Sequence, residues 1–328
     1  MNAELHAARP LESRRLVIVT GKGGTGKTTI AAALALGAAA LGRRVLVAAV
    51  DPDTRLAALL GPSPAPLAFE PALIRENIWV CHIEPFEALG EYLGLQLHTR
   101  RLVDPVLRQR AFRQLLLAAP GWRELITLGK VWHLEQMRDG VDRPRFDLIV
   151  VDAPATGHGL TFLDVPRVVV SAVRTGPLRH QTERVEALIE DRSRTLLLPV
   201  ALAEELPVRE TVELVTRARR ELGVALDRVV VNAVHEPPYP DDLADLDRRL
   251  AALPDDTPLG ALPPPRVLAA CGATLRARAE LNRRYVAQLA EQTGLPTATL
   301  PYLRDGLRGP DDTARLAAAL LAPLGAAA

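Results

Sequence analysis

Ten residues near the start of the chain, from Thr20 to Thr29, combine glycine, lysine and hydroxyl side chains in a phosphate-binding pattern. The segment contains the complete spacing Gly-x4-Gly-Lys-Thr. In such a loop the glycines let backbone N–H groups turn toward an anion, and the start of the following helix adds partial positive charge. The pattern predicts that Lys27 reaches the β- and γ-phosphates of a nucleotide and that the Thr28 hydroxyl binds Mg²⁺.

Two of the chain's three lysines lie in this loop. Of the 40 lysine and arginine residues, only Lys22, Lys27 and Lys130 are lysines. Lysine is a compact point charge on a flexible stem, and the planar fork of arginine does not replace it at a phosphate. The placement of these lysines therefore favours phosphate binding over a simple glycine-rich turn.

The flanking segments have the patterns needed to position such a loop. An apolar run over residues 16–19 predicts a buried strand before it, and an alanine-rich run over residues 30–41 predicts a helix after it. A second predicted strand, at 43–50, ends at Asp51-Pro52-Asp53. Open α/β sheets bind ligands at the carboxyl ends of their strands, so Asp51 is a candidate site residue.

The segment 146–152 places another acid at the end of a strand. Consecutive apolar residues followed by Asp152 match a Walker B pattern, in which the acid holds Mg²⁺, usually through water. Any strand can end in aspartate, so the pattern gains its weight from the complete phosphate loop before it. Thr28, Asp51 and Asp152 together form the predicted Mg²⁺ site.

The rest of the chain alternates between predicted strands and helices. Strands are expected at 77–83, 195–201, 228–232 and 297–300, and helices at 178–191, from Pro207 onward, at 267–292 and at 311–321. Because proline cannot donate to a ladder, Pro199 predicts an edge position or a bulge for its strand. The proline-rich stretch 235–265 predicts a loop with one short helix at 241–252.

These patterns predict an α/β fold with a doubly wound, mainly parallel sheet and helices on both faces. The helical stretch at about 86–140 is longer than one crossover connection needs, which predicts a helical insertion. We expect residues 1–14 to be a mobile lead-in and residues 15–328 to form a single ATPase domain.

Composition argues against several other classes of protein. The net charge of +1 implies no general attraction to nucleic acid or to an anionic membrane. Two distant cysteines, Cys81 and Cys271, suggest neither a disulfide framework nor a cysteine-rich metal site. No apolar run approaches the ~20 residues of a membrane span, and the first residues lack the apolar core of a secretory signal. We therefore expect a cytoplasmic protein with no nucleic-acid partner and no permanent membrane insertion.

The phosphate loop resembles a particular variant of the Walker A motif. Lys22 directly follows the first glycine, and the resulting Lys-Gly-Gly-Thr-Gly-Lys-Thr is similar to the deviant Walker A of the SIMIBI class of NTPases. In that class the extra lysine crosses a dimer interface and contacts the phosphates bound by the partner subunit. The resemblance implies that Lys22 stabilises transition-state charge in the partner's site, as an arginine finger does elsewhere.

Within this class, a second motif resembles the ArsA family, which includes arsenical-pump ATPases and the ATPase that targets tail-anchored membrane proteins. The segment from Asp152 to Leu160 is similar to the family's switch II. Its switch residues are Pro154, Gly157 and His158, and the shape of this loop would depend on the γ-phosphate. Residues 120–124 also resemble a Pro-Gly-x-x-Glu segment of the family's helical region.

The resemblance implies roles for individual residues toward ATP and Mg²⁺. Asp51, in a segment similar to the family's switch I, would position or activate the attacking water, and Asn232 resembles the asparagine that binds adenine. The residues implied to hold the phosphates are Gly21, Gly23, Gly24, Thr25, Gly26, Lys27, Thr28 and Thr29. The alternatives are that Asp51 is an ordinary turn acid, His158 a structural histidine and Asn232 a loop cap.

Departures from the family pattern concern the cargo more than the nucleotide. Cys81 and Cys271 fall in a predicted strand and a predicted helix, which argues against a thiolate site for As(III) or Sb(III). The chain has two methionines and no Cys-x-x-Cys zinc clasp, so a methionine-rich client groove is not evident. Residues 53–55 replace the family's Ala-His-Ser or Ala-His-Asn in switch I with Asp-Thr-Arg.

The leading interpretation is a Mg²⁺-dependent ATPase that acts as a nucleotide-switched homodimer, or as a heterodimer with a paralogue, and carries a client protein or membrane partner on its helical region. One alternative is a nucleotide-binding regulatory subunit of low activity paired with an active paralogue, which the altered switch I motivates. Another is a ParA- or MinD-like positioning ATPase. The resemblance of the His158 segment and the lack of a basic or amphipathic tail disfavour it.

Overall fold

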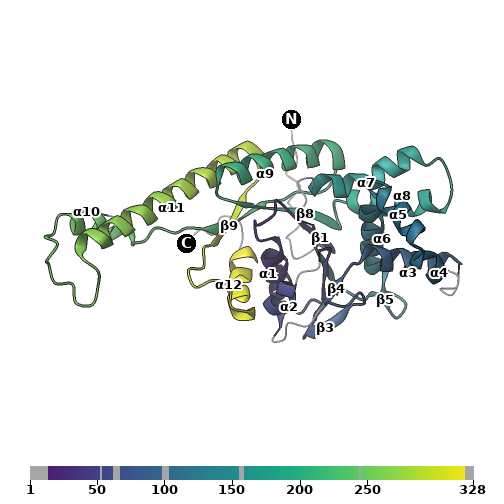
Figure 1. Ribbon diagram of the computed structural model, residues 1–328, viewed down its shortest axis with the longest axis horizontal. Coiled ribbons are helices and arrows are strands. Elements are labelled where there is room, and N and C mark those ends of the chain that lie inside the picture. The colour runs from purple at the N-terminus through teal and green to yellow at the C-terminus, as the bar shows by residue number, and fades with distance from the viewer. Residues whose placement is uncertain are drawn as a thin grey trace.

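The computed structural model describes residues 14–51, 54–61, 67–97, 103–154, 159–243 and 245–321. Its centre is an eight-stranded sheet with the order β10-β9-β8-β1-β7-β2-β4-β3, covered by helices (Figure 1). The strands are β1 Leu16–Thr20, β2 Val45–Ala49, β3 Ala72–Arg75, β4 Ile78–His82, β7 Leu148–Asp152, β8 Thr195–Leu202, β9 Val229–Val234 and β10 Thr297–Pro301. All neighbouring pairs are parallel except β3 with β4. The predicted α/β fold with a mainly parallel sheet is confirmed.

Helices occupy most of the chain between the strands. In the first half they are α1 Lys27–Ala40, α2 Thr54–Leu60, α3 Pro85–Leu97, α4 Val103–Arg108, α5 Arg110–Ala118 and α6 Trp122–Gln136. In the second half they are α7 Gly159–Ala172, α8 Pro177–Glu190, α9 Glu205–Arg217, α10 Leu246–Ala251, α11 Pro265–Thr293 and α12 Pro310–Leu321. Short segments complete the described chain: the hairpin β5 Arg138–Asp139 with β6 Arg143–Pro144, the π-helical η2 Ala218–Leu222 and the 3₁₀ turn η3 Asp241–Leu243.

The central strands are apolar along most of their length because both faces of the sheet are covered. Alternate residues point to opposite faces. Val17 and Val19 pack with α1 and α12 in one core, while Leu16 and Ile18 pack with α6, α7 and α8 in another. A third cluster joins β8 and β9 to α9 and α11. This packing fixes the strands whose carboxyl ends carry the candidate site residues.

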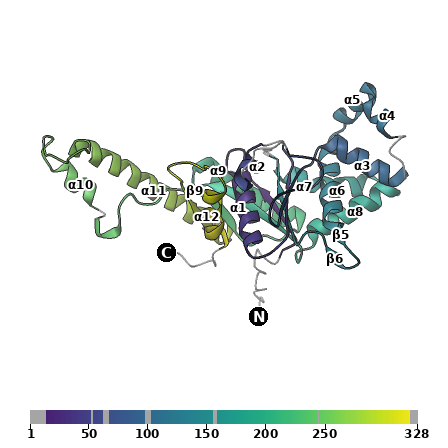
Figure 2. The same ribbon diagram turned by 90° about the horizontal axis from the view of Figure 1, so that it is seen from below.

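Helices α3 to α6 follow β4 and lie at one end of the molecule together with α8 (Figure 2). The helical pattern predicted from about residue 86 to 140 is present in the described residues of this stretch. Helix α7 and the edge strand β3 have no counterpart in the sequence prediction. The lead-in predicted for residues 1–14 lies outside the described residues except for Arg14, which is buried.

The edge position predicted for the strand that contains Pro199 is wrong. Strand β8 lies inside the sheet, with β1 on one side and β9 on the other. Pro199 aligns with Thr20 at the end of the β1 ladder, and β9 pairs with β8 only from Val200 onward. The missing N–H of Pro199 therefore falls between the Leu196–Ala225 bridge and the β9 ladder, where pairing on that side is interrupted, so an interior strand tolerates it.

At the other end of the molecule, α10 and the first part of α11 project from the body as an arm (Figures 1 and 2). Helix α10 lies along α11, and an ion pair between Arg276 and the buried Asp247 joins them, with Nη1 2.7 Å from Oδ1. The short helix predicted at 241–252 and the long helix predicted at 267–292 are both confirmed.

Candidate functional site

The phosphate loop connects β1 to α1 and bends sharply at three glycines. Gly21, Gly24 and Gly26 have φ angles of 147°, 85° and 93°, a region that favours glycine. A Cβ on Gly21 would lie 2.3 Å from the Val200 carbonyl oxygen, and one on Gly26 would lie 2.2 Å from Asn232 Nδ2. Close approach of β8 and β9 therefore requires glycine at both positions, in addition to the backbone angle.

Hydrogen bonds within the loop converge on the Lys22 carbonyl oxygen. The Thr25 hydroxyl donates to it at 2.9 Å, and Lys27 Nζ donates to it at 3.2 Å. Asn232 on β9 supports the loop from outside, because its Nδ2 donates to the Thr25 carbonyl at 3.0 Å. Thr25 is buried and acts inside the loop. The loop thus keeps its shape through hydrogen bonds of its own and through a hydrogen bond from the sheet.

Lys27 lies in a largely buried position between two carboxylates. Burial lowers the pKa of its ammonium group from the ordinary value, while the charges of Asp152 and Asp51 act in the opposite direction. Anionic phosphate beside Nζ would add to the effect of the carboxylates and favour the charged form. The position suits a lysine that binds the phosphates of a nucleotide.

Thr28, in the first turn of α1, meets Asp152 at the end of β7. The Thr28 hydroxyl donates to Asp152 Oδ2 at 2.7 Å, and Asp152 is buried. Strand β7 lies beside β1 in the register Val19 to Asp152, which brings the acid level with the start of the phosphate loop. A hydroxyl and a carboxylate are hard oxygen donors of the kind Mg²⁺ prefers, so these residues fit the metal. Mg²⁺ sites of this type use few protein ligands, and the described residues contain no cluster of three or more His, Cys, Asp or Glu side chains.

A cavity of about 460 Å³ opens above these residues at the carboxyl end of the sheet. It brings together Lys27, Thr28, Asp51 and Asp152, all of which the sequence had singled out. Its lining residues are Gly24, Gly26, Lys27, Thr28, Thr29, Asp51, Arg55, Ala58, Leu59, Asp152, Ala153, Leu307, Arg308 and Gly309. The volume is within the range of small-molecule and cofactor sites.

Other predicted residues lie outside the lining of this cavity. Gly21, Gly23 and Thr25 belong to the loop but do not line the cavity. Asn232 lies beneath the loop, at the contact with Thr25 described above. Lys22 points away and pairs with Glu210 on α9, and 41% of its side chain is exposed. Its exposed position contrasts with that of Lys27.

The predicted switch segments are described only in part. Asp51 is exposed at the end of β2, where it lines the cavity. In switch II, Pro154 is half-buried just beyond Asp152 and Ala153. Gly157 and His158 lie outside the described residues, as do Pro52 and Asp53 of switch I.

Sequence reasoning missed the contribution of the loop before α12. Leu307, Arg308 and Gly309 line the cavity, although they lie far from the phosphate loop in the chain. The Arg308 N–H donates to Asp312 Oδ2 at 2.9 Å, which ties the loop to the start of α12. The signal was available: this loop follows a predicted strand, and the carboxyl ends of parallel strands share one edge of the sheet.

The parallel sheet, the glycine loop between β1 and α1, and the acid at the end of the neighbouring β7 define a P-loop nucleoside triphosphatase. The family model described as anion-transporting ATPase matches residues 14–178, half of the chain. The chain belongs to this family, the ArsA ATPases. This confirms the family predicted from the sequence.

Individual relatives agree with the family match. ATPase BagA of Mycobacterium tuberculosis is 37% identical over 226 residues, which cover 68% of this chain and 66% of that protein. The putative arsenical pump-driving ATPase of Halobacterium salinarum is 28% identical over 258 residues, 73% of this chain and 38% of that protein. ATPase ASNA1 homolog 1 of Paramecium tetraurelia is 23% identical over 273 residues, 71% of this chain and 78% of that protein. The matched stretch is thus just under two thirds of the mycobacterial protein.

Proposed function

We propose that the protein hydrolyses ATP with Mg²⁺ inside a nucleotide-switched dimer in the cytoplasm, and that its helical end carries a client or membrane partner. The observation that carries the proposal is the contrast between two lysines of one loop. Lys27 lines the nucleotide cavity, whereas Lys22 lies outside it and is exposed. A lysine whose side chain lies outside the cavity of its own subunit suits the site of a second subunit.

The residues of the cavity have separate tasks in this proposal. Lys27 binds the β- and γ-phosphates and neutralises their charge. Thr28 and Asp152 would hold Mg²⁺, and the bound ion would supply positive charge near the phosphates. Asp51 orients the attacking water from the exposed end of β2, and the partner's Lys22 stabilises the transition state. When the dimer closes, Lys22 would leave Glu210 and contact the nucleotide bound by the partner subunit. The position of Lys22 would therefore depend on closure.

A pair of variants tests the shared site. We expect Lys22→Ala to lower kcat by about 100-fold or more while ATP still binds, because the lysine acts mainly in the transition state. Asp51→Asn should be similarly slow. Glu210→Gln is the matched control, because it removes the partner that Lys22 has within its own chain and should keep most of the activity.

Mixing the two slow variants gives the decisive measurement. In a mixed dimer, the site with intact Asp51 receives intact Lys22 from the other subunit. Random mixing should therefore restore about a quarter of the wild-type rate. No recovery in mixtures that do exchange subunits, or normal turnover by Lys22→Ala alone, would contradict the shared site.

A regulatory subunit of low activity is a second candidate. Arg55, which belongs to the altered switch I, lines the nucleotide cavity, so the departure from the family pattern faces the nucleotide. Measurable turnover by the purified chain alone, abolished by Asp51→Asn, would exclude this candidate. If only addition of a paralogue produces turnover, the regulatory reading is favoured.

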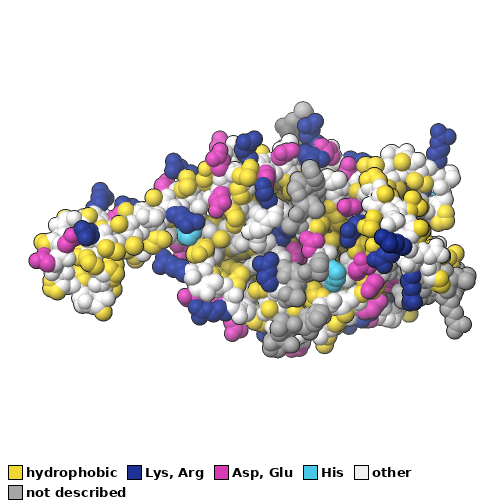
Figure 3. All heavy atoms as spheres, viewed as in Figure 1, with side chains coloured by type: hydrophobic (Ala, Val, Ile, Leu, Met, Phe, Trp, Pro, Cys, Tyr) yellow, Lys and Arg dark blue, Asp and Glu magenta, His cyan; other side chains and the backbone are white. Residues whose placement is uncertain are grey.

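Client binding and the positioning alternative are tested separately. A pull-down with Asp51→Asn, with and without ATP, should recover a client only in one nucleotide state. Basic and acidic side chains are interspersed on the face seen in Figure 3, which gives no support to DNA binding on that face. The described residues include no helix long and apolar enough to span a bilayer. Tight binding to DNA or to anionic liposomes would revive the positioning alternative.

A further inference from the structure

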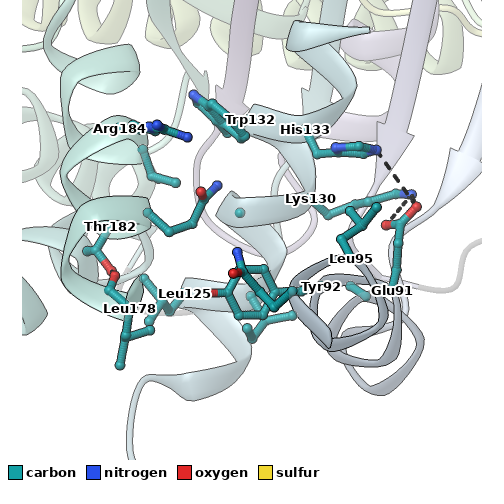
Figure 4. Close-up of a pocket in the computed structure, with 16 residues that line it drawn as sticks. Glu91, Tyr92, Leu95, Leu125, Lys130, Trp132, His133, Leu178, Thr182 and Arg184 are labelled. Carbon is teal, nitrogen blue, oxygen red and sulfur yellow. Dashed lines mark hydrogen bonds and ion pairs between the residues drawn. The ribbon is translucent and has the colours of Figure 1, made fainter. Parts of the chain in front are cut away.

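A second cavity, of about 240 Å³, lies between α3, α6 and α8, at the helical end of the molecule. Figure 4 shows side chains from α3 and α6 on one side and from α8 on the other. Its walls include Ala88, Leu125 and Val185, and its rim includes Leu95 and Leu178, which are 58% and 42% exposed. Exposed leucines around an apolar hollow are typical of a binding site.

Gly129 indicates that the cavity between α3, α6 and α8 is not a chance packing defect. It lies inside α6 and lines the cavity, and a Cβ built on it meets no atom of the described residues within 4 Å. Glycine inside a helix costs about 1 kcal/mol relative to alanine. Neither its backbone angle nor a close neighbour among the described residues requires glycine here. The missing side chain therefore keeps the cavity open at a cost to the helix.

The size of the cavity limits its occupant. A cavity of about 240 Å³ lies just below the ~300–1,000 Å³ of drug-sized ligand sites, which suits a ligand of about ten non-hydrogen atoms. A largely apolar hollow of this volume fits a small molecule.

The charges of the lining determine the chemistry of that molecule. Lys130 and Glu91 form a buried ion pair with Nζ 2.9 and 2.7 Å from the two carboxylate oxygens, so each satisfies the other. Arg184 lies over the Trp132 ring at 5.7 Å, and among the described residues no carboxylate forms a salt bridge with it. The lining therefore has one cation in excess, and this residue, Arg184, is exposed. An apolar body with an anionic head would match both features.

We propose that the cavity between α3, α6 and α8 binds a small amphipathic carboxylate, with its apolar chain beside Gly129 and its head at Arg184. This site is separate from the nucleotide cavity and does not depend on the function proposed above. A ligand of this size should bind with a Kd on the order of 0.1 mM.

Octanoate, 1-octanol and butyrate test the proposal on the purified full-length chain by calorimetric titration. We expect saturable binding of octanoate, weaker binding of octanol, which lacks the charge, and no binding of butyrate, which lacks the chain. Gly129→Leu should abolish octanoate binding by filling the cavity. Gly129→Ala is the matched control, since it makes the same change in helix propensity with one added methyl group and should keep binding. Arg184→Gln should weaken octanoate about three- to tenfold and leave octanol unchanged, because the guanidinium is exposed.

Several results would overturn the proposal. These are absence of saturable octanoate binding, unchanged binding by a folded Gly129→Leu, or equal affinity for octanol and octanoate. Thermal melting shows whether each variant folds. Should Gly129→Leu fail to fold, a photoreactive octanoate analogue with the wild-type chain replaces it. Crosslinks to α3, α6 and α8 that excess octanoate suppresses would support the site, and crosslinks confined to other elements would contradict it.

Discussion

Gly24 and Gly26 form a matched pair for testing how the sheet holds the phosphate loop. Both glycines have left-handed φ angles, 85° and 93°. A Cβ on Gly26 would lie 2.2 Å from Asn232 Nδ2, whereas a Cβ on Gly24 meets no atom of the described residues within 4 Å. We therefore predict that Gly26→Ala weakens ATP binding much more than Gly24→Ala does.

The expected difference follows from the contacts of Asn232. The left-handed backbone costs alanine about 1–2 kcal/mol at either position. Gly26→Ala must in addition displace Asn232, which breaks the 3.0 Å bond to the Thr25 carbonyl. That bond is worth about 1 kcal/mol, and an off-rotamer amide costs about another 1 kcal/mol. Because bound phosphate requires the native loop, we expect Gly24→Ala to lose about 5- to 30-fold in affinity and Gly26→Ala about 100- to 1000-fold.

Titration of each variant with a fluorescent ATP analogue and Mg²⁺ measures these affinities. The double variant Gly26→Ala with Asn232→Ala should bind better than Gly26→Ala alone, because the clashing amide is gone while the backbone strain stays. Equal losses for Gly24→Ala and Gly26→Ala would refute the steric argument. Failure of Asn232→Ala to restore any affinity would refute the assignment of the clash to that side chain.

Other predictions concern stability and reactivity away from the loop. Lys130→Met should lower the free energy of unfolding by about 3 kcal/mol in a denaturant titration, because it leaves Glu91 without its buried partner, and a second change, Glu91→Gln, should recover most of the loss. Burial raises the pKa of the Cys81 thiol to about 12. A thiol reagent at pH 8 should therefore modify only the exposed Cys271 in the folded chain, and both cysteines in denaturant. Rapid labelling of two thiols under native conditions would contradict this prediction. Burial raises the pKa of Asp147, but hydrogen bonds from Arg44 outweigh that effect and hold it below its ordinary value. The stabilisation by Asp147 is therefore complete above the unfolded pKa of about 3.9 and is lost as the pH falls through the lower folded value, so the stability gap between wild type and Asp147→Asn should narrow below about pH 4.

The parts of the site that depend on local sequence could be predicted. The phosphate loop is contiguous, so its glycines and lysines specify its shape and charge without knowledge of the fold. Asp51 and Asp152 were predictable because both end apolar strands, and the carboxyl ends of parallel strands meet at one edge. The long helix α11 has unbroken helical spacing and was predicted almost to its ends.

The parts that depend on contacts between distant segments could not be predicted in the same way. The position of Pro199 followed from where the β9 ladder begins, which no local pattern encodes. The contact of Lys22 with Glu210 joins a loop to a helix that lies 188 residues further along the chain. In the sequence, Gly129 is only a residue that destabilises a helix. Its place in the wall of a cavity follows from the packing of α3 and α8 against α6, which no local pattern encodes. The contribution of Leu307 to the nucleotide cavity likewise depends on a contact between segments that are distant in the chain.

The packing of α12 on α1 has a consequence for how the protein is made. A Cβ on Gly37 of α1 would lie 2.4 Å from Leu321 Cδ1 and 3.3 Å from Ala317 Cβ, so the last described helix lies directly on the helix of the phosphate loop. About 270 residues separate the two helices. At ~5–20 residues per second, a ribosome needs roughly 14–54 s to synthesise them. Throughout that interval the alanine-rich face of α1 remains uncovered, and the nucleotide cavity lacks the wall that Arg308 supplies. We therefore expect the nascent chain to acquire its nucleotide affinity late, after most of the sheet is formed.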